Sequence, residues 1–422
     1  MEDPTAYVSH PDISHEREHP RTGKYSQSEQ IPDETKLTTC ECKDSGRNLV
    51  VCIDGTSNQF GQKNTNVIEM YRDLVKDDMQ VTFYNSGIGT YARPSWKSWS
   101  YLKQVVDNTI DLAIAWNFEK IIISAYHWLS ENYRSGDRIF LFGFSRGAYQ
   151  VRALSAMIAK VVGLIHRGNE DQIPFAYELY AKPRPSKSQE KEGPTAEMFK
   201  ETFSHNVRVH FVGAWDTVSS VGILRDKTLP NTAEGMHHVC FFRHALALDE
   251  RRVKFLPEYT YGGRASKEES YSERFTSSVQ HAEDSIPHTK EVWFAGTHSD
   301  IGGGNSKNSN LDRGKPALRW MSREAESVGI HFAPRLTRWE WEKLGAVNES
   351  LTLAWKFIEL LPIRRLSYKG KNITTFRPHL GKGRRIDIGQ QLHASVIFSS
   401  NKLYKPRAQL WPDGGGNSNL KS

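Results

Sequence analysis

Five short apolar runs, separated by segments with helical spacing, constrain the fold of this chain more than any other feature. The runs are Asn48–Asp54, Gln80–Asn85, Asp137–Phe144, Arg208–Trp215 and Glu291–Ala295. Continuous apolar runs of this length are typical of strands buried on both faces of a parallel sheet. Helical spacing lies between several of them, over Thr65–Leu74, Leu112–Trp128 and Ala148–Val162. The alternation predicts an α/β fold, a doubly wound and mostly parallel sheet with helices on both faces.

The rest of the chain divides around this core. Residues 1–47 are polar and rich in Pro, Ser, Thr, Glu and His, which predicts a flexible tail. We expect one catalytic domain over residues 48–330, with insertions at 166–205 and 231–288. A C-terminal extension, 331–422, packs on this domain or continues it and ends in a frayed segment. Further helices are expected over Ala317–Ser327 and Leu351–Leu361.

The first insertion, His166–His205, contains the charged, proline-bearing stretch Lys182–Pro194. Such a composition buries too little apolar surface to offset the entropy of ordering. We therefore expect this insertion to be mobile and to gate or border the site.

Charge narrows the classes of partner. The chain carries 56 basic and 49 acidic residues, a formal net charge of +7 over 422 residues. This mild excess favours contact with an anionic membrane surface, and an ordinary solvated basic surface explains it equally well. It is too sparse for a nucleic-acid binder. The N-terminal residues lack the apolar core of a signal peptide, and no apolar run approaches the ~18 residues that span a bilayer. We expect a cytoplasmic protein with at most transient membrane association.

The four cysteines give a weak signal. Cys40 and Cys42 flank one residue in a polar segment, and no nearby cluster of His or Cys completes a zinc site. Cys52 and Cys240 lie in apolar runs and are expected to be buried thiols, which favours a reducing compartment. No metal site is expected.

The segment Gly143-Phe144-Ser145-Arg146-Gly147 matches the pattern G-x-S-x-G. Its context makes the match specific, because it follows the strand-like run DRIFLF and precedes a helical run. Ser145 on such a tight turn takes a strained backbone, and the turn leaves room only for glycine at 143 and 147. The serine hydroxyl is then exposed at a helix N-terminus, where developing negative charge is stabilised. Ser145 is the candidate nucleophile, against a plain turn with a capping serine.

A serine nucleophile needs a histidine base and a carboxylate that orients the histidine. Asp216 follows one strand-like run and His298 follows a later one, so both should open onto the sheet edge that carries Ser145. His393 and His244 are the rival bases. Asp216 could instead cap a helix, and Asp300 could be the acid or bind a cation with the neighbouring glycines.

When a serine attacks a carbonyl carbon, the carbonyl oxygen becomes an oxyanion that needs hydrogen-bond donors. We expect two backbone amides to stabilise it. One is the amide of Arg146, the residue after the nucleophile. The other comes from the loop after the first strand, where Asp54 is followed by Gly55 and Thr56. A simple glycine turn with a helix cap is compatible with this interpretation. Asp54 and Asp300 are possible supporting residues.

Several motifs together resemble a known family. They are CIDGTSN, NTNV, YNSGIGT, FLFGFSRGAYQVRAL, GAWDTVSSVG, RHALALDERR and WFAGTHSDIGGG, with a weaker echo in HLGKGRRIDIGQQLHASV and YKPRAQLW. The set resembles the α/β-hydrolase catalytic domain of type VI secretion phospholipase effectors, over about residues 48–327. The resemblance implies a Ser–Asp–His triad at Ser145, Asp216 and His298 and a lipid-ester substrate. The chain is similar to eukaryotic, fungal members, so the biology of secretion effectors should not be transferred.

The leading hypothesis is a serine hydrolase that cleaves a carboxylic ester, of a phospholipid or another lipid, without a cofactor or metal. One alternative is a metal-dependent phosphoesterase that gathers a cation between Asp54, Asp216 and Asp300. Another is a non-catalytic binding protein that retains the fold. The expected partner is the lipid or acyl-ester substrate, with no nucleic acid. The sequence identifies no protein partner.

Overall fold

The computed structural model describes most of the chain from residue 40 onward. The described residues are 40, 42, 46–55, 61–87, 108–181, 195–218, 229, 232, 236–260, 287–305, 314–334, 347–362, 365–366, 374–387, 389–397 and 404–410. The expected tail before residue 40 and the stretch Lys182–Pro194 lie outside them.

Within the described residues, seven strands form one sheet in the order β12-β8-β7-β6-β3-β1-β2. Every neighbouring pair is parallel. The strands are β1 (Asn48–Ile53), β2 (Gln80–Asn85), β3 (Arg138–Phe144), β6 (Val209–Trp215), β7 (Val239–Ala247), β8 (Thr289–Phe294) and β12 (Gln391–Leu392). Because all strands point the same way, their C-terminal ends meet at one edge of the sheet.

Helices and turns connect these strands. They are α1 (Asn66–Asp73), α3 (Asn108–Asn132), α4 (Arg146–Ala156), the π-helical turn η2 (Met157–Val162), the 3₁₀ turns η3 (Glu170–Gln172) and η4 (Val253–Phe255), α5 (Ile173–Ala181), α6 (Thr195–Phe203), α8 (His298–Ile301), α9 (Gly314–Glu326), α10 (Leu353–Glu359) and α11 (Ala394–Ile397). In the described part of the chain, two-stranded pairs also lie outside the main sheet: β4 (Leu164–Ile165) with β5 (Ser204–His205), β9 (Arg365–Leu366) with β10 (Thr374–Thr375), and β11 (Arg385–Ile386) with β13 (Gln409–Leu410).

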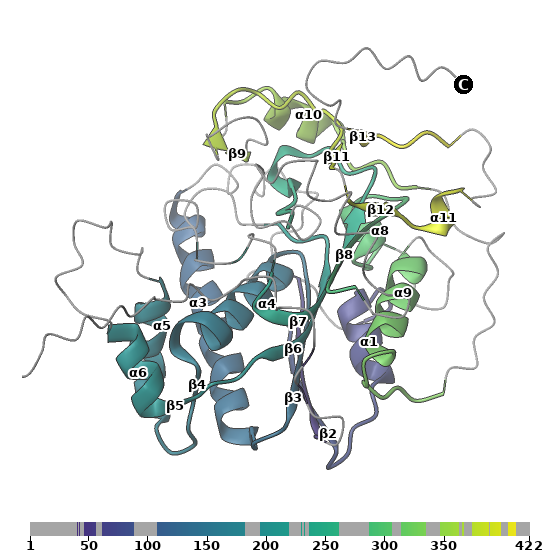
Figure 1. Ribbon diagram of the computed structural model, residues 1–422. Coiled ribbons are helices and arrows are strands. Elements are labelled where there is room, and N and C mark those ends of the chain that lie inside the picture. Colours follow the sequence, from purple (N-terminus) through teal and green to yellow (C-terminus); the bar gives the residue numbers. More distant parts are fainter. Residues whose placement is uncertain are drawn as a thin grey trace, which may run out of the picture. The chain divides into compact units, whose positions relative to one another are not determined.

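Both faces of the sheet are covered. On β1, Leu49, Val51 and Ile53 pack into the core beneath α3 and α4, whereas Val50 and Cys52 point into the core beneath α1 and α9. Figure 1 shows the two helical layers on opposite sides of the strands. The prediction of a doubly wound, parallel α/β sheet is confirmed, because alternate residues of one continuous apolar run serve two separate cores.

Two expectations about insertions need correction. Residues 239–247, expected within an insertion, form the buried strand β7 between β6 and β8. Its polar residues obscured the strand signal, and they have buried partners: Arg243 pairs with Glu324 of α9 and His244 with Glu291 of β8. The ends of the 166–205 insertion form α5 and α6, which bury Tyr180 and Phe199 and pack against the core.

The C-terminal extension packs directly on the domain that contains the sheet. Its strand β12 pairs with β8 at the edge of the sheet, and Ala408 and Ile386 belong to a small core with Trp293. Among the described helices, none combines the length and hydropathy that crossing a bilayer requires.

Candidate active site

Ser145 and Asp216 follow neighbouring strands at the same height. Phe144, the last residue of β3, pairs in register with Trp215, the last residue of β6. The Ser145 amide donates to the Trp215 carbonyl at 3.0 Å, so the ladder between β3 and β6 extends by one bond past the end of β3. The two side chains are therefore placed by sheet geometry, although 70 residues separate them in the chain (146 to 215).

The turn at Ser145 has the strained backbone that the motif predicts, but the expected exposure of the serine is wrong, because Ser145 is buried with 8% of its surface exposed. Ser145 has φ 60° and ψ −122°, and α4 begins at the next residue. A Cβ on Gly143 would lie 2.5 Å from the Gly147 carbonyl oxygen, and one on Gly147 would lie 2.3 Å from the Ile53 oxygen. Both contacts are with backbone, so neither can relax by a side-chain rotation. Glycine is required at both positions, as the motif predicts.

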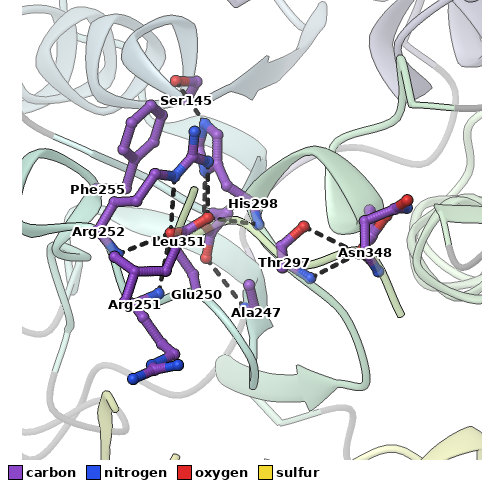
Figure 2. A network of polar contacts seen from close by, with 12 residues as sticks. Ser145, Ala247, Glu250, Arg251, Arg252, Phe255, Thr297, His298, Asn348 and Leu351 are labelled. Atoms are coloured by element: carbon purple, nitrogen blue, oxygen red, sulfur yellow. Dashed lines mark hydrogen bonds and ion pairs between the residues drawn. The ribbon is translucent and has the colours of Figure 1, made fainter. Parts of the chain in front are cut away.

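Ser145, His298 and Asp216 form one hydrogen-bonded series. His298 Nε2 lies 2.9 Å from Ser145 Oγ, and His298 Nδ1 lies 2.6 Å from Asp216 Oδ2. Figure 2 shows the imidazole directed at Ser145. Because the Asp216 carboxylate only accepts, Nδ1 carries the proton and Nε2 is left to accept from the serine hydroxyl. This is the geometry that a general base for Ser145 needs.

Packing and capping hold the His298 ring. The ring lies between Phe144 and Phe255, with centroids 4.7 and 4.8 Å away. Thr297 and Asp300 form a capping box at the start of α8, which fixes the backbone at His298. Burial lowers the pKa of His298, and the hydrogen bond to Asp216 opposes that shift without cancelling it. His298 is therefore neutral near pH 7, the form in which it can accept a proton.

Asp216 is held by a buried arginine from the C-terminal extension. Arg384 donates to Asp216 Oδ1 at 2.5 Å and to Oδ2 at 2.8 Å, and both side chains are at most 1% exposed. The Ala247 amide adds a bond to Oδ1 at 3.0 Å. Burial alone would raise the pKa of Asp216, but Arg384 and His298 hold it well below its usual range. Asp216 is therefore ionised and oriented toward His298.

A second buried ion pair supports the loop around His298. Glu250 accepts from both the Nε and Nη2 of Arg252 and, at 3.2 Å, from the His298 backbone amide. Arg252 in turn lies over the Phe255 ring, 3.7 Å from its centroid. Burial raises the pKa of Glu250, yet the charge and hydrogen bonds of Arg252 lower it to about 2. Figure 2 shows this group beside His298.

Comparison with known proteins shows which family this sequence matches. Residues 47–324 match the model of the catalytic domain of Tle1-like phospholipase effectors of the type VI secretion system, which is more than half of the chain. The chain belongs to this family.

Relatives of this Tle1-like chain include an uncharacterised protein of Saccharomyces cerevisiae, YEL023C, which is 38% identical over 233 residues. That alignment covers 50% of this chain and 32% of the yeast protein, so the chain matches about a third of its relative's length.

Solved structures show more distant likeness. An uncharacterised protein from Pseudomonas aeruginosa aligns with a TM-score of 0.36 and 16% identity, over 68% of this chain and 46% of that one. The Tle1 effector bound to the VgrG spike aligns at 0.30 and 15%, over 62% and 51%. Thermogutta terrifontis esterase 2 aligns at 0.30 and 11%, over 71% and 90%.

Glu250 and Arg252 of the Tle1-like domain, and Arg384 of the C-terminal extension, were not identified from the sequence as site residues. All three lie in segments that carry the family resemblance, RHALALDERR and the echo HLGKGRRIDIGQQLHASV. Their one recognisable feature in the sequence is that they are charged residues in apolar or glycine-rich surroundings. Glu250 and Arg252 pair with each other within one segment, whereas the contact of Arg384 with Asp216 depends on how the extension packs.

The rival bases have other partners. His244 Nδ1 lies 3.0 Å from Glu291, and its Nε2 accepts from the Thr217 amide at 3.1 Å, so both ring nitrogens are used. The His393 ring stacks on Phe294, and its Nδ1 contacts Ser395. Of the three histidines considered, the structure places His298 at Ser145.

The three aspartates considered for a metal are held separately. Asp54 accepts from Gly55, Thr65 and Tyr84. Asp300 accepts from Thr297, Asn305 and Asn348, and Asp216 is held as described above. Among the residues that the structure describes, no grouping of three or more metal-binding side chains includes any of them.

The first-strand loop differs from expectation at Gly55. The Gly55 amide donates to the Asp54 carboxylate at 2.6 Å, which directs it to a neighbouring side chain rather than toward the site. Thr56 lies outside the described residues. Arg146 is the first residue of α4, where helix geometry directs amides toward anionic oxygens.

The expectation that no cluster of His or Cys accompanies Cys40 and Cys42 is wrong. The structure brings them together with His210 of β6 and Cys240 of β7. Local sequence contains no signal of this group, because the two strand residues lie 168 and 198 positions beyond Cys42.

Proposed function

We propose that this chain is a serine esterase that cleaves a carboxylic ester of a phospholipid or another lipid through an acyl-enzyme. The observation that carries the proposal is the hydrogen-bonded series from Ser145 Oγ through His298 to the Asp216 carboxylate, with separations of 2.9 and 2.6 Å. Membership of a phospholipase-like family supports it.

The geometry suits acyl transfer in two steps. Ser145 Oγ attacks the ester carbonyl carbon while His298 Nε2 takes the hydroxyl proton, and the Asp216 carboxylate stabilises the imidazolium that forms. The C–O bond to the leaving alcohol breaks as the same proton passes to that alcohol. Water then attacks the acyl-serine with His298 again acting as base, which releases the fatty acid and restores the hydroxyl.

Each step transiently places negative charge on the carbonyl oxygen. The amide of Arg146, in the first turn of α4, is the first donor that we assign to this oxygen. Because the Gly55 amide is directed to Asp54, we assign the second donor to Thr56 rather than to Gly55.

Helix α10 supports a lipid substrate. Leu353, Phe357 and Leu360 are 75%, 73% and 60% exposed, and their spacing places them on one helical face. The opposite face is anchored, because Ile358 is buried and Glu359 accepts from the Val253 amide at 2.6 Å.

The same helix is close to the catalytic histidine proposed above. Trp355 packs edge-on against Phe255, and Phe255 contacts the His298 ring. An exposed apolar face on a rigid helix beside the site is suited to contact with acyl chains or a lipid surface.

The proposal is tested by covalent labelling of the full chain with a fluorophosphonate probe. Label should map to Ser145 and disappear in Ser145→Ala, while Ser155→Ala, a buried serine on the same helix, labels like the wild type. Label that persists in Ser145→Ala refutes the nucleophile. A folded wild type that neither labels nor hydrolyses esters favours a binding protein that retains the fold.

A further inference from the structure

Four side chains with metal-binding atoms meet at the end of the sheet opposite Ser145. Cys40, Cys42, His210 and Cys240 each direct one ligand atom into the group, and all these atoms lie within 4.8 Å of one another. Cys40 Sγ lies 3.3 Å from His210 Nδ1, and Cys42 Sγ lies 3.6 Å from Cys240 Sγ. Nothing in the esterase mechanism uses them.

The separations match those of a tetrahedral zinc site. With Zn–S bonds of about 2.3 Å and Zn–N bonds of about 2.0–2.1 Å, neighbouring ligand atoms in a tetrahedron lie about 3.5–3.8 Å apart. The two measured contacts fall close to this range, and the 4.8 Å limit leaves only small side-chain rotations. Three sulfurs and one imidazole form the Cys₃His set of structural zinc sites, whereas magnesium and calcium prefer oxygen ligands.

His210 has the tautomer that a metal-binding histidine needs. Its Nε2 lies 3.0 Å from the Val328 carbonyl oxygen, which can only accept, so Nε2 carries the proton and Nδ1 presents a lone pair to the sulfurs. This is the outer hydrogen bond that typically orients a metal-bound histidine. Phe140 and Phe241 lie edge-on to the ring, 5.0 and 5.4 Å away, and fix its plane.

The two strand ligands are brought together by sheet register. His210 is the second residue of β6 and Cys240 the second of β7, between the register pairs Val209–Val239 and Phe211–Phe241. Both are 5% exposed. The CxC segment that precedes β1 supplies the other two ligands.

A disulfide explains the group less well. The Cys42 and Cys240 sulfurs are 3.6 Å apart, against about 2.05 Å in a disulfide. All four cysteines of the chain are free thiols in this structure, and one disulfide here would leave Cys40 and His210 without a role.

We propose that Cys40, Cys42, His210 and Cys240 bind one structural zinc ion. Zinc(II) forms three Zn–S bonds as the three thiol protons leave to solvent, and it accepts the lone pair of His210 Nδ1 with no change of oxidation state. The ion ties the segment before β1 to the amino ends of β6 and β7. Arg47, the residue before β1, pairs with Asp137, the residue before β3, at 2.6 Å. Asp216 follows the other end of β6, so the ion stabilises the strand that carries the acid without touching the reacting atoms.

The test measures zinc in the full chain, purified in a non-thiol reductant without chelator. We expect one zinc ion per chain by mass spectrometry of the elements. Cys42→Ser and Cys240→Ser should lose the ion during gel filtration. Cys52→Ala, which removes a buried thiol outside the group, should keep it. Cobalt(II) added to the metal-free wild type should give a thiolate charge-transfer band and tetrahedral ligand-field bands, both absent in Cys42→Ser.

Removal of zinc should lower the melting temperature of the wild type and leave that of Cys42→Ser unchanged. The proposal is overturned by wild type that neither carries nor binds zinc, by loss of zinc from Cys52→Ala equal to that from Cys42→Ser, or by a Cys42–Cys240 disulfide in the protein purified under reductant. Iron in place of zinc also overturns it.

Discussion

The buried pair of Arg384 and Asp216 makes Arg384→Met an informative perturbation. Arg384 donates to both carboxylate oxygens and also to the carbonyls of Ala247 and Phe255, at 3.1 and 2.6 Å. Methionine fills much of the same volume but donates nothing. The variant leaves a buried carboxylate with two remaining donors, the Ala247 amide and His298 Nδ1.

Removing one partner of a buried ion pair typically costs ~3–5 kcal/mol of folding free energy. Because two donors remain on Asp216, we expect the lower end, about 3 kcal/mol, in a urea titration. Arg377→Met, an exposed arginine of the same extension, is the matched control and should change stability by at most ~0.5 kcal/mol. Adding Asp216→Asn should recover part of the loss, since no buried charge is then left unpaired.

The pH dependence of kcat/KM distinguishes an electrostatic effect of Arg384 on the site from a purely structural role. Arg384 offsets the negative charge of Asp216, and that negative charge favours the protonated form of His298. Without Arg384 the pKa of His298 rises, the base stays protonated to higher pH, and the acid limb of kcat/KM moves to higher pH. An unmoved acid limb together with a wild-type unfolding free energy would refute this account of Arg384.

Three further predictions follow from the site and from α10. Asp216→Asn should keep the fold but lower kcat by about 10⁴-fold, because an amide no longer selects the tautomer of His298; a single-turnover assay with a soluble ester measures this, and a loss below tenfold contradicts it. In the wild type, the lowered pKa of His298 keeps the base neutral in mild acid, so kcat/KM should decline only below the ordinary histidine pKa of about 6.5; a decline centred above pH 7 contradicts the burial argument. Phe357→Asp on the exposed face of α10 should reduce hydrolysis of anionic phospholipid vesicles and leave hydrolysis of a soluble short-chain ester unchanged, whereas Met198→Asp, an exposed apolar residue of α6, should affect neither; equal loss on both substrates would assign Phe357 to folding instead.

Much of the fold could be predicted because its signals are local. Continuous apolar runs marked β1, β2, β3, β6 and β8, since a strand buried on both faces needs apolar residues at every position. The strand β7 was missed because Arg243 and His244 interrupt its apolar pattern. Their partners, Glu324 and Glu291, come from α9 and β8 and are not visible in the local sequence.

In the candidate site, too, some residues could be predicted from local sequence and others could not. Ser145 could be identified from the sequence, because its turn requires glycine at two fixed positions within five residues. Asp216 and His298 could be proposed because parallel strands end at one edge, so that position after a strand predicts proximity. The rival His393 was expected just before a possible strand, and in the structure it follows β12, where its ring stacks on Phe294 and its Nδ1 contacts Ser395.

The sequence by itself determined the sheet, the strained serine turn and the edge at which the site forms, because each depends on residue type over a short span. Tertiary structure alone decided which charges meet in the interior. Arg384 reaches Asp216 from 168 residues away, and Cys42 meets Cys240 across 198 residues. These partners follow from sheet order and from the path of the C-terminal extension, and both arise only when distant segments pack together.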